Sequence, residues 1–94
     1  MPYLLVRHKV ADYAKWKAVF DAGISLRRVA GEKNFRIFHS AGDPNDLVML
    51  FEWADMDQAR QFMGSPVLKI GMQRCGVTED LGHWFLEEAA SGVV

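Results

Sequence analysis

The sequence has little cysteine, little excess charge of either sign and no long apolar run. Its single cysteine, Cys75, cannot form a disulfide within the chain, and no run approaches the roughly 18 apolar residues of a transmembrane helix. Eleven Lys and Arg against twelve Asp and Glu give a net charge of −1, which argues against nucleic-acid or membrane partners. No basic segment followed by an apolar run opens the sequence, so we expect a cytoplasmic protein.

The composition is that of an ordinary globular chain. Half of the 94 residues are hydrophobic, 12% are aromatic and 24% are charged, which excludes a disordered, collagenous or coiled-coil chain. This length is too short for two independent cores. We therefore expect a single domain over residues 1–94.

The first half of the sequence predicts a strand, a helix and two strands. Tyr3–Val10 is rich in branched and aromatic residues, which favours a strand. Asp12 suits a helix N-cap and Gly31 a helix terminator, with an apolar stripe between them. Asn34–Ser40 predicts a second strand before the turn-forming residues 42–45. Leu47–Trp53 is the most apolar run and predicts the centre of a sheet.

The second half predicts a broken helix and a last strand. Asp55 suits the cap of a helix through Met63, and Gly64 breaks it before the Ser65–Pro66 pair restarts a helix that ends at Gly76. Leu81–Glu88 predicts the fourth strand. The order is therefore βαββαβ, which is typical of an α+β ferredoxin-like fold with an antiparallel four-stranded sheet and helices on one face.

The strands have more apolar surface than two helical segments can cover. The first and third strands carry apolar residues on both faces, with Tyr3 and Leu5 opposite Leu4 and Val6, and Val48 and Leu50 opposite their neighbours. A patch of that size on a small monomer indicates an interface. We therefore predict a homodimer through the sheet face, with a lined cavity between the two sheets.

The run Phe51-Glu52-Trp53, followed by Ala54, Asp55, a helix through Phe62 and the Ser65-Pro66 restart, resembles the dimeric alpha-beta barrel superfamily and, within it, the antibiotic-biosynthesis monooxygenase-like group. The resemblance implies a fold shared by oxygenases that use neither metal nor flavin, polyketide cyclases and haem-degrading enzymes. Phe62 and Met72 stand where haem-degrading members carry Trp and His, which disfavours haem cleavage. Trp53 matches a cavity-facing tryptophan at the end of the third strand.

The resemblance implies a cofactor-independent monooxygenase or cyclase-like enzyme that acts on a small aromatic or polyketide-like substrate, in a cavity between the sheet and either the helices or the dimer partner. It implies no cofactor. Two alternatives stay open: a module that binds an apolar metabolite without chemistry, and a domain whose sheet face serves assembly only. An oriented polar side chain inside an otherwise apolar pocket would favour the enzyme.

His8 is the candidate catalytic residue. It shares a strand face with apolar residues, where a neutral imidazole could remove a phenolic proton, although a structural, hydrogen-bonded histidine fits the same pattern. A period of two places Met49 and Phe51 beside Trp53, and these three residues with Trp84 are the expected walls for a flat ring. His39 is expected at the rim of this pocket.

Other polar residues receive structural interpretations. Glu52 alternates with Trp53, so it is expected on the helix side with Arg7 as its partner. Trp84, rather than the adjacent His83, is expected to face the cavity. The spacing of the three histidines does not suit a metal site, and Cys75 on an apolar helix face is expected to be unreactive.

Overall fold

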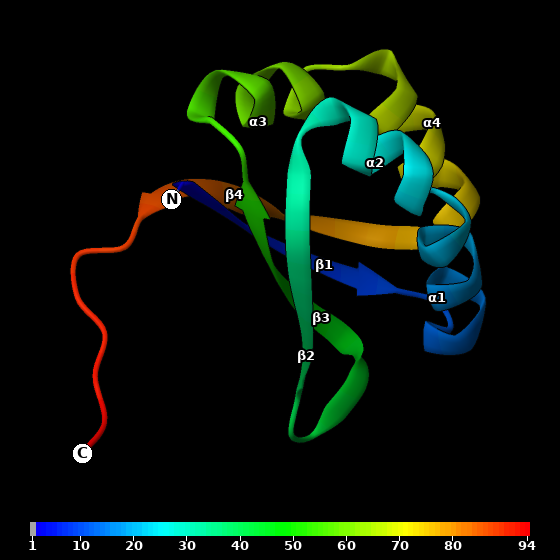
Figure 1. The fold of residues 1–94 in the computed structure, drawn as a ribbon. Helices are drawn as coiled ribbons and strands as arrows, with labels where there is room; N and C mark the ends of the chain where they lie inside the picture. The colour runs from blue at the N-terminus through cyan, green and yellow to red at the C-terminus, as the bar shows by residue number, and fades with distance from the viewer. Residues whose placement is uncertain (1) are drawn as a thin grey trace.

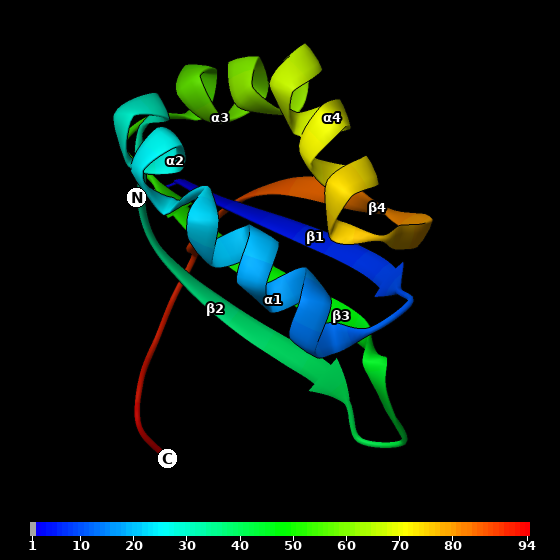
Figure 2. The same ribbon diagram turned by 90° about the vertical axis from the view of Figure 1, so that its right-hand side faces the viewer.

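The structure, a computed structural model that describes residues 2–94, has a four-stranded antiparallel sheet with the helices on one face (Figures 1 and 2). The strand order is β2-β3-β1-β4. The elements are β1 (Pro2–Val10), α1 (Tyr13–Ala22), α2 (Ile24–Ala30), β2 (Glu32–Ser40), β3 (Asp43–Trp53), α3 (Met56–Met63), α4 (Pro66–Cys75) and β4 (Val77–Glu87). The predicted βαββαβ ferredoxin-like fold is confirmed.

The predicted helix starts are confirmed by side-chain caps. Asp12 accepts a hydrogen bond from the Lys15 amide at 3.1 Å, and Asp55 accepts one from the Gln58 amide at 2.8 Å. Ser65 caps α4 in the same way. These bonds satisfy amides that the first helical turn leaves without a partner.

Some predicted boundaries were wrong. The single helix expected between Asp12 and Gly31 is two helices, because the chain leaves helical geometry at Gly23 between α1 and α2. The expected hairpin loop over residues 42–45 is shorter, since Ser40 already pairs with Asp43. The last strand begins at Val77 rather than Leu81.

The core lies between the helices and one face of the two central strands. Alternate residues of β1 and β3 point to this face and are buried. The Phe20 ring of α1 stacks on Trp16, with ring centroids 4.8 Å apart, and both contribute to the same core. The buried apolar strand residues are Leu4, Val6, Val10, Leu47, Met49, Phe51 and Trp53.

The other face of the sheet has no helix over it, and we call it the open face. Its apolar residues are Tyr3, Leu5, Phe38, Val48, Leu50, Trp84 and Leu86. Phe38 is 53% exposed, and Trp84 is 47% exposed. Residues 88–94 form no strand or helix and extend away from the sheet (Figure 1).

The predicted contact between Arg7 and Glu52 was wrong. Trp53 faces the helices, so the alternation along β3 places Glu52 on the open face rather than on the helix side. Arg7 instead forms an ion pair with Asp46, with Nη2 and Oδ2 2.8 Å apart. The sequence alternation separates the two faces correctly, but it does not say which one the helices cover.

Candidate functional site

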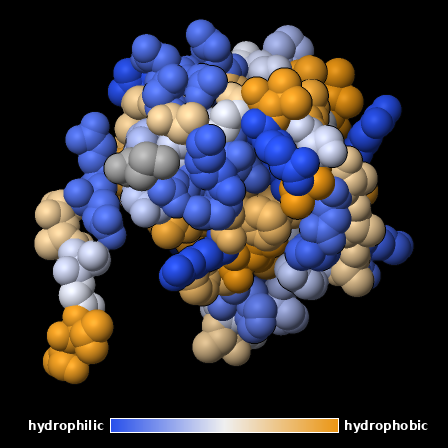
Figure 3. Space-filling view, viewed as in Figure 1, coloured by the Kyte–Doolittle hydropathy of each residue, from blue (hydrophilic) through white to orange (hydrophobic). Residues whose placement is uncertain are grey.

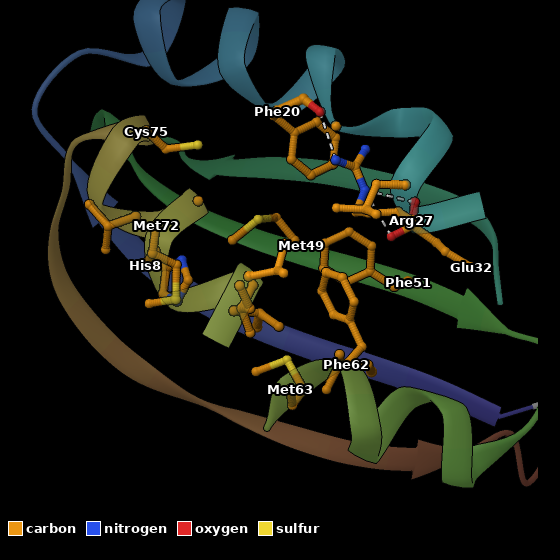
Figure 4. Close-up of a pocket in the computed structure, with 18 of the residues that line it drawn as sticks. His8, Phe20, Arg27, Glu32, Met49, Phe51, Phe62, Met63, Met72 and Cys75 are labelled. Atoms are coloured by element: carbon orange, nitrogen blue, oxygen red, sulfur yellow. Dashed lines mark hydrogen bonds and ion pairs between the residues drawn. The ribbon is translucent and has the colours of Figure 1, made fainter. Parts of the chain in front are cut away.

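A cavity of about 160 Å³ lies between the sheet and the helix layer (Figure 4). Its floor is formed by β1 and β3, and its sides by α1, α2, α3 and α4. Two of its lining residues, Leu26 and Val67, are about half exposed and mark where it reaches the surface. Figure 3 shows apolar side chains gathered on the molecular surface over α2 and α4. An apolar ligand could therefore approach the cavity from this side.

Three of the expected wall residues, Met49, Phe51 and Trp53, line this cavity. They come from one face of β3 and are all buried. This cavity lies between the sheet and the helices of one chain, one of the two positions expected; a cavity between the sheets of two partners stays a prediction. The helix layer does not seal against the sheet, since none of the residues of α4 is fully buried.

Trp84 and His39 do not line the cavity. Trp84 pairs with Leu5 on the open face, so it cannot share one cavity with Trp53 within a chain. Its ring lies over Gly82, where an added Cβ would come within 3.3 Å of the indole. His39 is exposed at the end of β2, with Nδ1 2.8 Å from the Ser40 carbonyl oxygen. Strand alternation fixes neither the face nor the depth of a side chain, so it did not place these two residues relative to this cavity.

His8 lines the cavity from the middle of β1 and is only 5% exposed. Its Nε2 lies 3.4 Å from Asp80 Oδ1, and no residue within 2–94 makes a hydrogen bond to this buried nitrogen. Burial lowers the pKa of His8, while the neighbouring Asp80 carboxylate opposes this effect. The imidazole is therefore neutral at pH 7 and able to accept a proton.

Acidification is expected to destabilise the fold through His8. Because burial lowers its pKa below the ordinary value of 6.5, the unfolded chain takes up this proton at a higher pH than the folded chain. The free energy of unfolding should then decrease as the pH falls from about 6.5 toward the folded-state pKa. Urea titrations across this range should show a weaker pH dependence for His8→Gln. His39→Gln is the control. If the free energy of unfolding depends on pH equally in His8→Gln, in His39→Gln and in the parent, His8 is not the source of the pH dependence.

The sequence analysis missed a buried ion pair between Arg27 of α2 and Glu32 of β2. Arg27 Nε lies 3.1 Å from both carboxylate oxygens of Glu32, and Arg27 Nη1 donates to the Phe20 carbonyl at 2.6 Å. The guanidinium also lies over the Phe20 ring, 3.7 Å from its centroid. Burial raises the pKa of Glu32, and the Arg27 charge opposes this rise. Both residues line the cavity.

One sequence signal could have identified Arg27. It follows Phe20 by seven residues, which is two helical turns, so it falls on the apolar side of the helical repeat. A charged residue at such a position needs a buried partner. The partner, Glu32, lies beyond the turn at Gly31 and only becomes adjacent through the path of the chain.

Cys75 also lines the cavity, and burial raises the pKa of its thiol. A protonated thiol is a poor nucleophile and a poor metal ligand. Within residues 2–94 there is no group of three or more His, Cys, Asp or Glu side chains that could hold a metal ion. No helix in the same range is long and apolar enough to cross a membrane.

Solved structures with the same architecture match nearly the whole chain. SnoaB, a cofactor-independent oxygenase from Streptomyces nogalater, matches with a TM-score of 0.77 and 15% identity over 96% of this chain and 94% of that one. A proposed antibiotic biosynthesis monooxygenase from Bordetella bronchiseptica matches with a TM-score of 0.77 and 14% identity, over 95% and 97% of the two chains. Rv0793 from Mycobacterium tuberculosis matches with a TM-score of 0.65 and 17% identity, over 99% and 100%.

This chain has the fold of the antibiotic biosynthesis monooxygenases. The resemblance inferred from the sequence is thereby confirmed at the level of the fold. No protein family model matches the chain, and no curated protein matches it in sequence. At these identities the monooxygenase fold does not by itself define a substrate or a reaction.

Proposed function

We propose that this protein is an oxygenase that acts without metal or flavin on a small aromatic substrate bound between the sheet and the helices. The observation that carries the proposal is His8, a buried and neutral imidazole in a largely apolar cavity. The fold that the chain shares with the cofactor-independent oxygenase SnoaB supports it. A buried histidine next to a cavity is the base that such chemistry requires.

The cavity is suited to one aromatic ring. A cavity of about 150 Å³ holds a benzene molecule, and the volume here is about 160 Å³. Phe51, Trp53 and Phe62 supply aromatic walls, and ring faces and edges pack favourably against a flat ligand. Larger substrates would have to extend toward the opening between Leu26 and Val67.

His8 would act as a general base on the bound ring. The proton is removed from a ring CH2 that is attached to a carbonyl group directly or through the aromatic ring. The resulting anion is electron-rich because its charge is delocalised onto the carbonyl oxygen. This anion passes one electron to dioxygen, and the resulting radical pair combines to form a C–O bond. The protonated His8 returns its proton to the peroxide, and loss of water from the resulting CH–OOH group gives C=O, so that one oxygen atom enters the product and the other leaves as water. The substrate supplies all the electrons, and no external reductant is needed.

Asp80 is placed to position the imidazole. A proton on Nε2 would face the Asp80 carboxylate, which lies 3.4 Å away. In that tautomer Nδ1 is the acceptor for the substrate proton. Asp80 itself is held by the Gly82 amide, which donates to its Oδ1 at 3.0 Å. Contacts of this kind often shorten when a substrate binds.

The proposal can be tested by oxygen uptake with ring compounds that carry an activated CH2, graded in size from 2-indanone to anthrone. We expect uptake that follows substrate concentration, persists after treatment with a metal chelator and yields the corresponding C=O product. Binding of these compounds without oxygen uptake would reject the enzyme and leave a binding module. Loss of activity after chelation would reject the metal-free reaction.

We also propose that two copies of the chain pair through their open faces. The supporting observation is the number of large apolar side chains that this face leaves exposed, including Phe38, Trp84 and Leu86. The Arg7–Asp46 ion pair on the same face is internally neutralised, so it does not oppose self-association. Large apolar side chains gathered on an exposed face of a small protein are typical of an interface.

A charge placed in the middle of the open face is expected to dissociate this dimer. Leu50 lies on the central strand β3 between Arg36 of β2 and Leu5 of β1. We expect Leu50→Glu to raise the dimer dissociation constant by at least about tenfold, because a charge added at this position must lose its hydration when the two faces meet. Analytical ultracentrifugation over a range of concentrations measures this effect. Val29→Glu is the matched control, since Val29 is 85% exposed on α2, away from the open face. A parent chain that is monomeric at micromolar concentration would reject the dimer.

A further inference from the structure

Four exposed apolar residues lie on the helix layer around the opening of the cavity, and we call them the helix patch. Leu26 and Val29 of α2 are 52% and 85% exposed. Val67 and Ile70 of α4 are 50% and 52% exposed. Leu26 and Val67 also line the cavity, so the helix patch begins at its opening. Figure 3 shows apolar side chains gathered over these two helices.

The helix patch does not belong to the core of the chain. Val67 and Ile70 are three residues apart, so they lie on one stripe of α4, as Leu26 and Val29 do on α2. The cavity side of α4 carries other apolar residues, including Met72. Both helices therefore have exposed apolar residues in addition to those that they turn inward. A surface helix with a second apolar stripe toward solvent indicates a binding surface.

The charges on α2 and α4 are all positive. The two helices carry Arg27, Arg28, Lys69 and Arg74 and no Asp or Glu, whereas α1 and α3 carry charges of both signs. Arg27 is buried and paired with Glu32, and the other three are exposed. The whole chain has twelve acidic and eleven basic residues, so its charge is unevenly distributed. The net charge of −1, which argues against a membrane partner, averages over this asymmetry.

The three exposed basic residues lie beside the helix patch, and we call them the basic rim. Arg28 directly precedes Val29, and Lys69 directly precedes Ile70. Arg74 follows Ile70 by one helical turn and continues its stripe. Apolar side chains with Lys and Arg next to them are typical of helices that bind the interface of an anionic membrane.

We propose that α2 and α4 dock on an anionic membrane surface. The helix patch enters the boundary between headgroups and acyl chains, and the basic rim contacts the negatively charged headgroups. A lipid surface fits this position better than a protein does. A protein that covered the helix patch would close the opening of the cavity, whereas lipid keeps the opening in contact with an apolar phase.

Docking in this orientation joins the cavity to the bilayer. The opening between Leu26 and Val67 faces the acyl chains, so an apolar molecule dissolved in the membrane enters without passing through water. The open face lies on the other side of the sheet, so pairing of two chains and membrane docking do not compete. The docking itself does not depend on the reaction proposed above.

Vesicle co-sedimentation tests the charge contribution. We expect the chain to bind phosphatidylcholine vesicles that contain phosphatidylserine, and to bind them less at high salt, which screens surface charges. Lys69→Gln should lower the partition coefficient about fivefold, the usual contribution of one basic residue near an anionic surface. Arg36→Gln is the matched control, because it removes the same charge from the open face, where Arg36 pairs with Leu50.

Val29→Glu tests the apolar contribution. Val29 is 85% exposed, so its replacement should leave the fold unchanged. We expect the partition coefficient to fall at least about tenfold, because the variant loses apolar surface and adds a charge that the headgroups repel. Leu50→Glu places the same charge on the open face and should retain vesicle binding.

Several results would overturn the proposal. They are the absence of binding at millimolar phosphatidylserine, equal binding to vesicles with and without phosphatidylserine, and equal losses in Lys69→Gln and Arg36→Gln. Binding of polyglutamate that requires Lys69, without vesicle binding, would replace the membrane by an acidic protein. Oxygen uptake in solution without vesicle binding would reject the docking and leave the oxygenase, and vesicle binding without oxygen uptake would do the reverse.

Discussion

Replacing His8 by glutamine is expected to lower oxygen-dependent turnover by roughly 10²- to 10⁴-fold, the usual contribution of a general base. Glutamine is uncharged and of similar size, but it cannot accept a proton at neutral pH. The effect should appear in kcat rather than in KM, since the removed interaction belongs to the reaction step. Oxygen-electrode kinetics with the best compound of the graded series measure both constants.

His39→Gln is the matched control for this experiment. His39 is exposed at the end of β2 and does not line the cavity, so its replacement should leave kcat and KM unchanged. His8→Ala should behave like His8→Gln in activity while the chain remains folded. Turnover of His8→Gln at the parent rate would remove His8 from the mechanism and leave it a structural residue.

Replacing Trp53 by alanine is expected to lower the free energy of unfolding by roughly 3–5 kcal/mol. Trp53 is 1% exposed at the end of β3, and its indole packs against the Phe62 ring with centroids 5.3 Å apart. The replacement loses this burial and leaves additional space beside a cavity that already exists. Urea unfolding followed by circular dichroism measures the change.

Trp84→Ala provides the comparison for Trp53→Ala. Trp84 is 47% exposed on the open face, so the same deletion removes less buried surface from the single chain. At concentrations below those at which the chain associates, its cost should be less than half that of Trp53→Ala. A negligible loss in Trp53→Ala would place the Trp53 ring in solvent and contradict the described core.

Local signals in the sequence predicted most of the fold. Apolar alternation identified the strands, and Asp12, Asp55 and Ser65 identified the helix starts, because these signals depend only on neighbours along the chain. The break at Gly23 was missed, since the apolar stripe of the predicted helix continues across it. A glycine within a helical pattern is compatible with either a continuous or a divided helix.

The candidate site was predicted in part. The family resemblance indicated Trp53, strand alternation added Met49 and Phe51, His8 was chosen on an apolar strand face, and all four line the cavity. Trp84 was preferred to its neighbour His83, because the two point to opposite faces, and it lies on the open face. The alternation separates residues of a strand into two sets, but the sequence does not relate the sets of one strand to those of the next.

By itself, the sequence determined the order of elements, their caps and the division of each strand into two faces, because these follow from contacts between residues close along the chain. Only the tertiary structure decided which face the helices cover, where the cavity lies and which charges meet. Arg27 and Glu32 illustrate the reason, since a turn at Gly31 brings helix α2 and strand β2 together in a geometry that spacing alone does not specify. Likewise, the register of β1 against β3 and β4 placed His8 beside the cavity and Trp84 on the opposite side of the sheet.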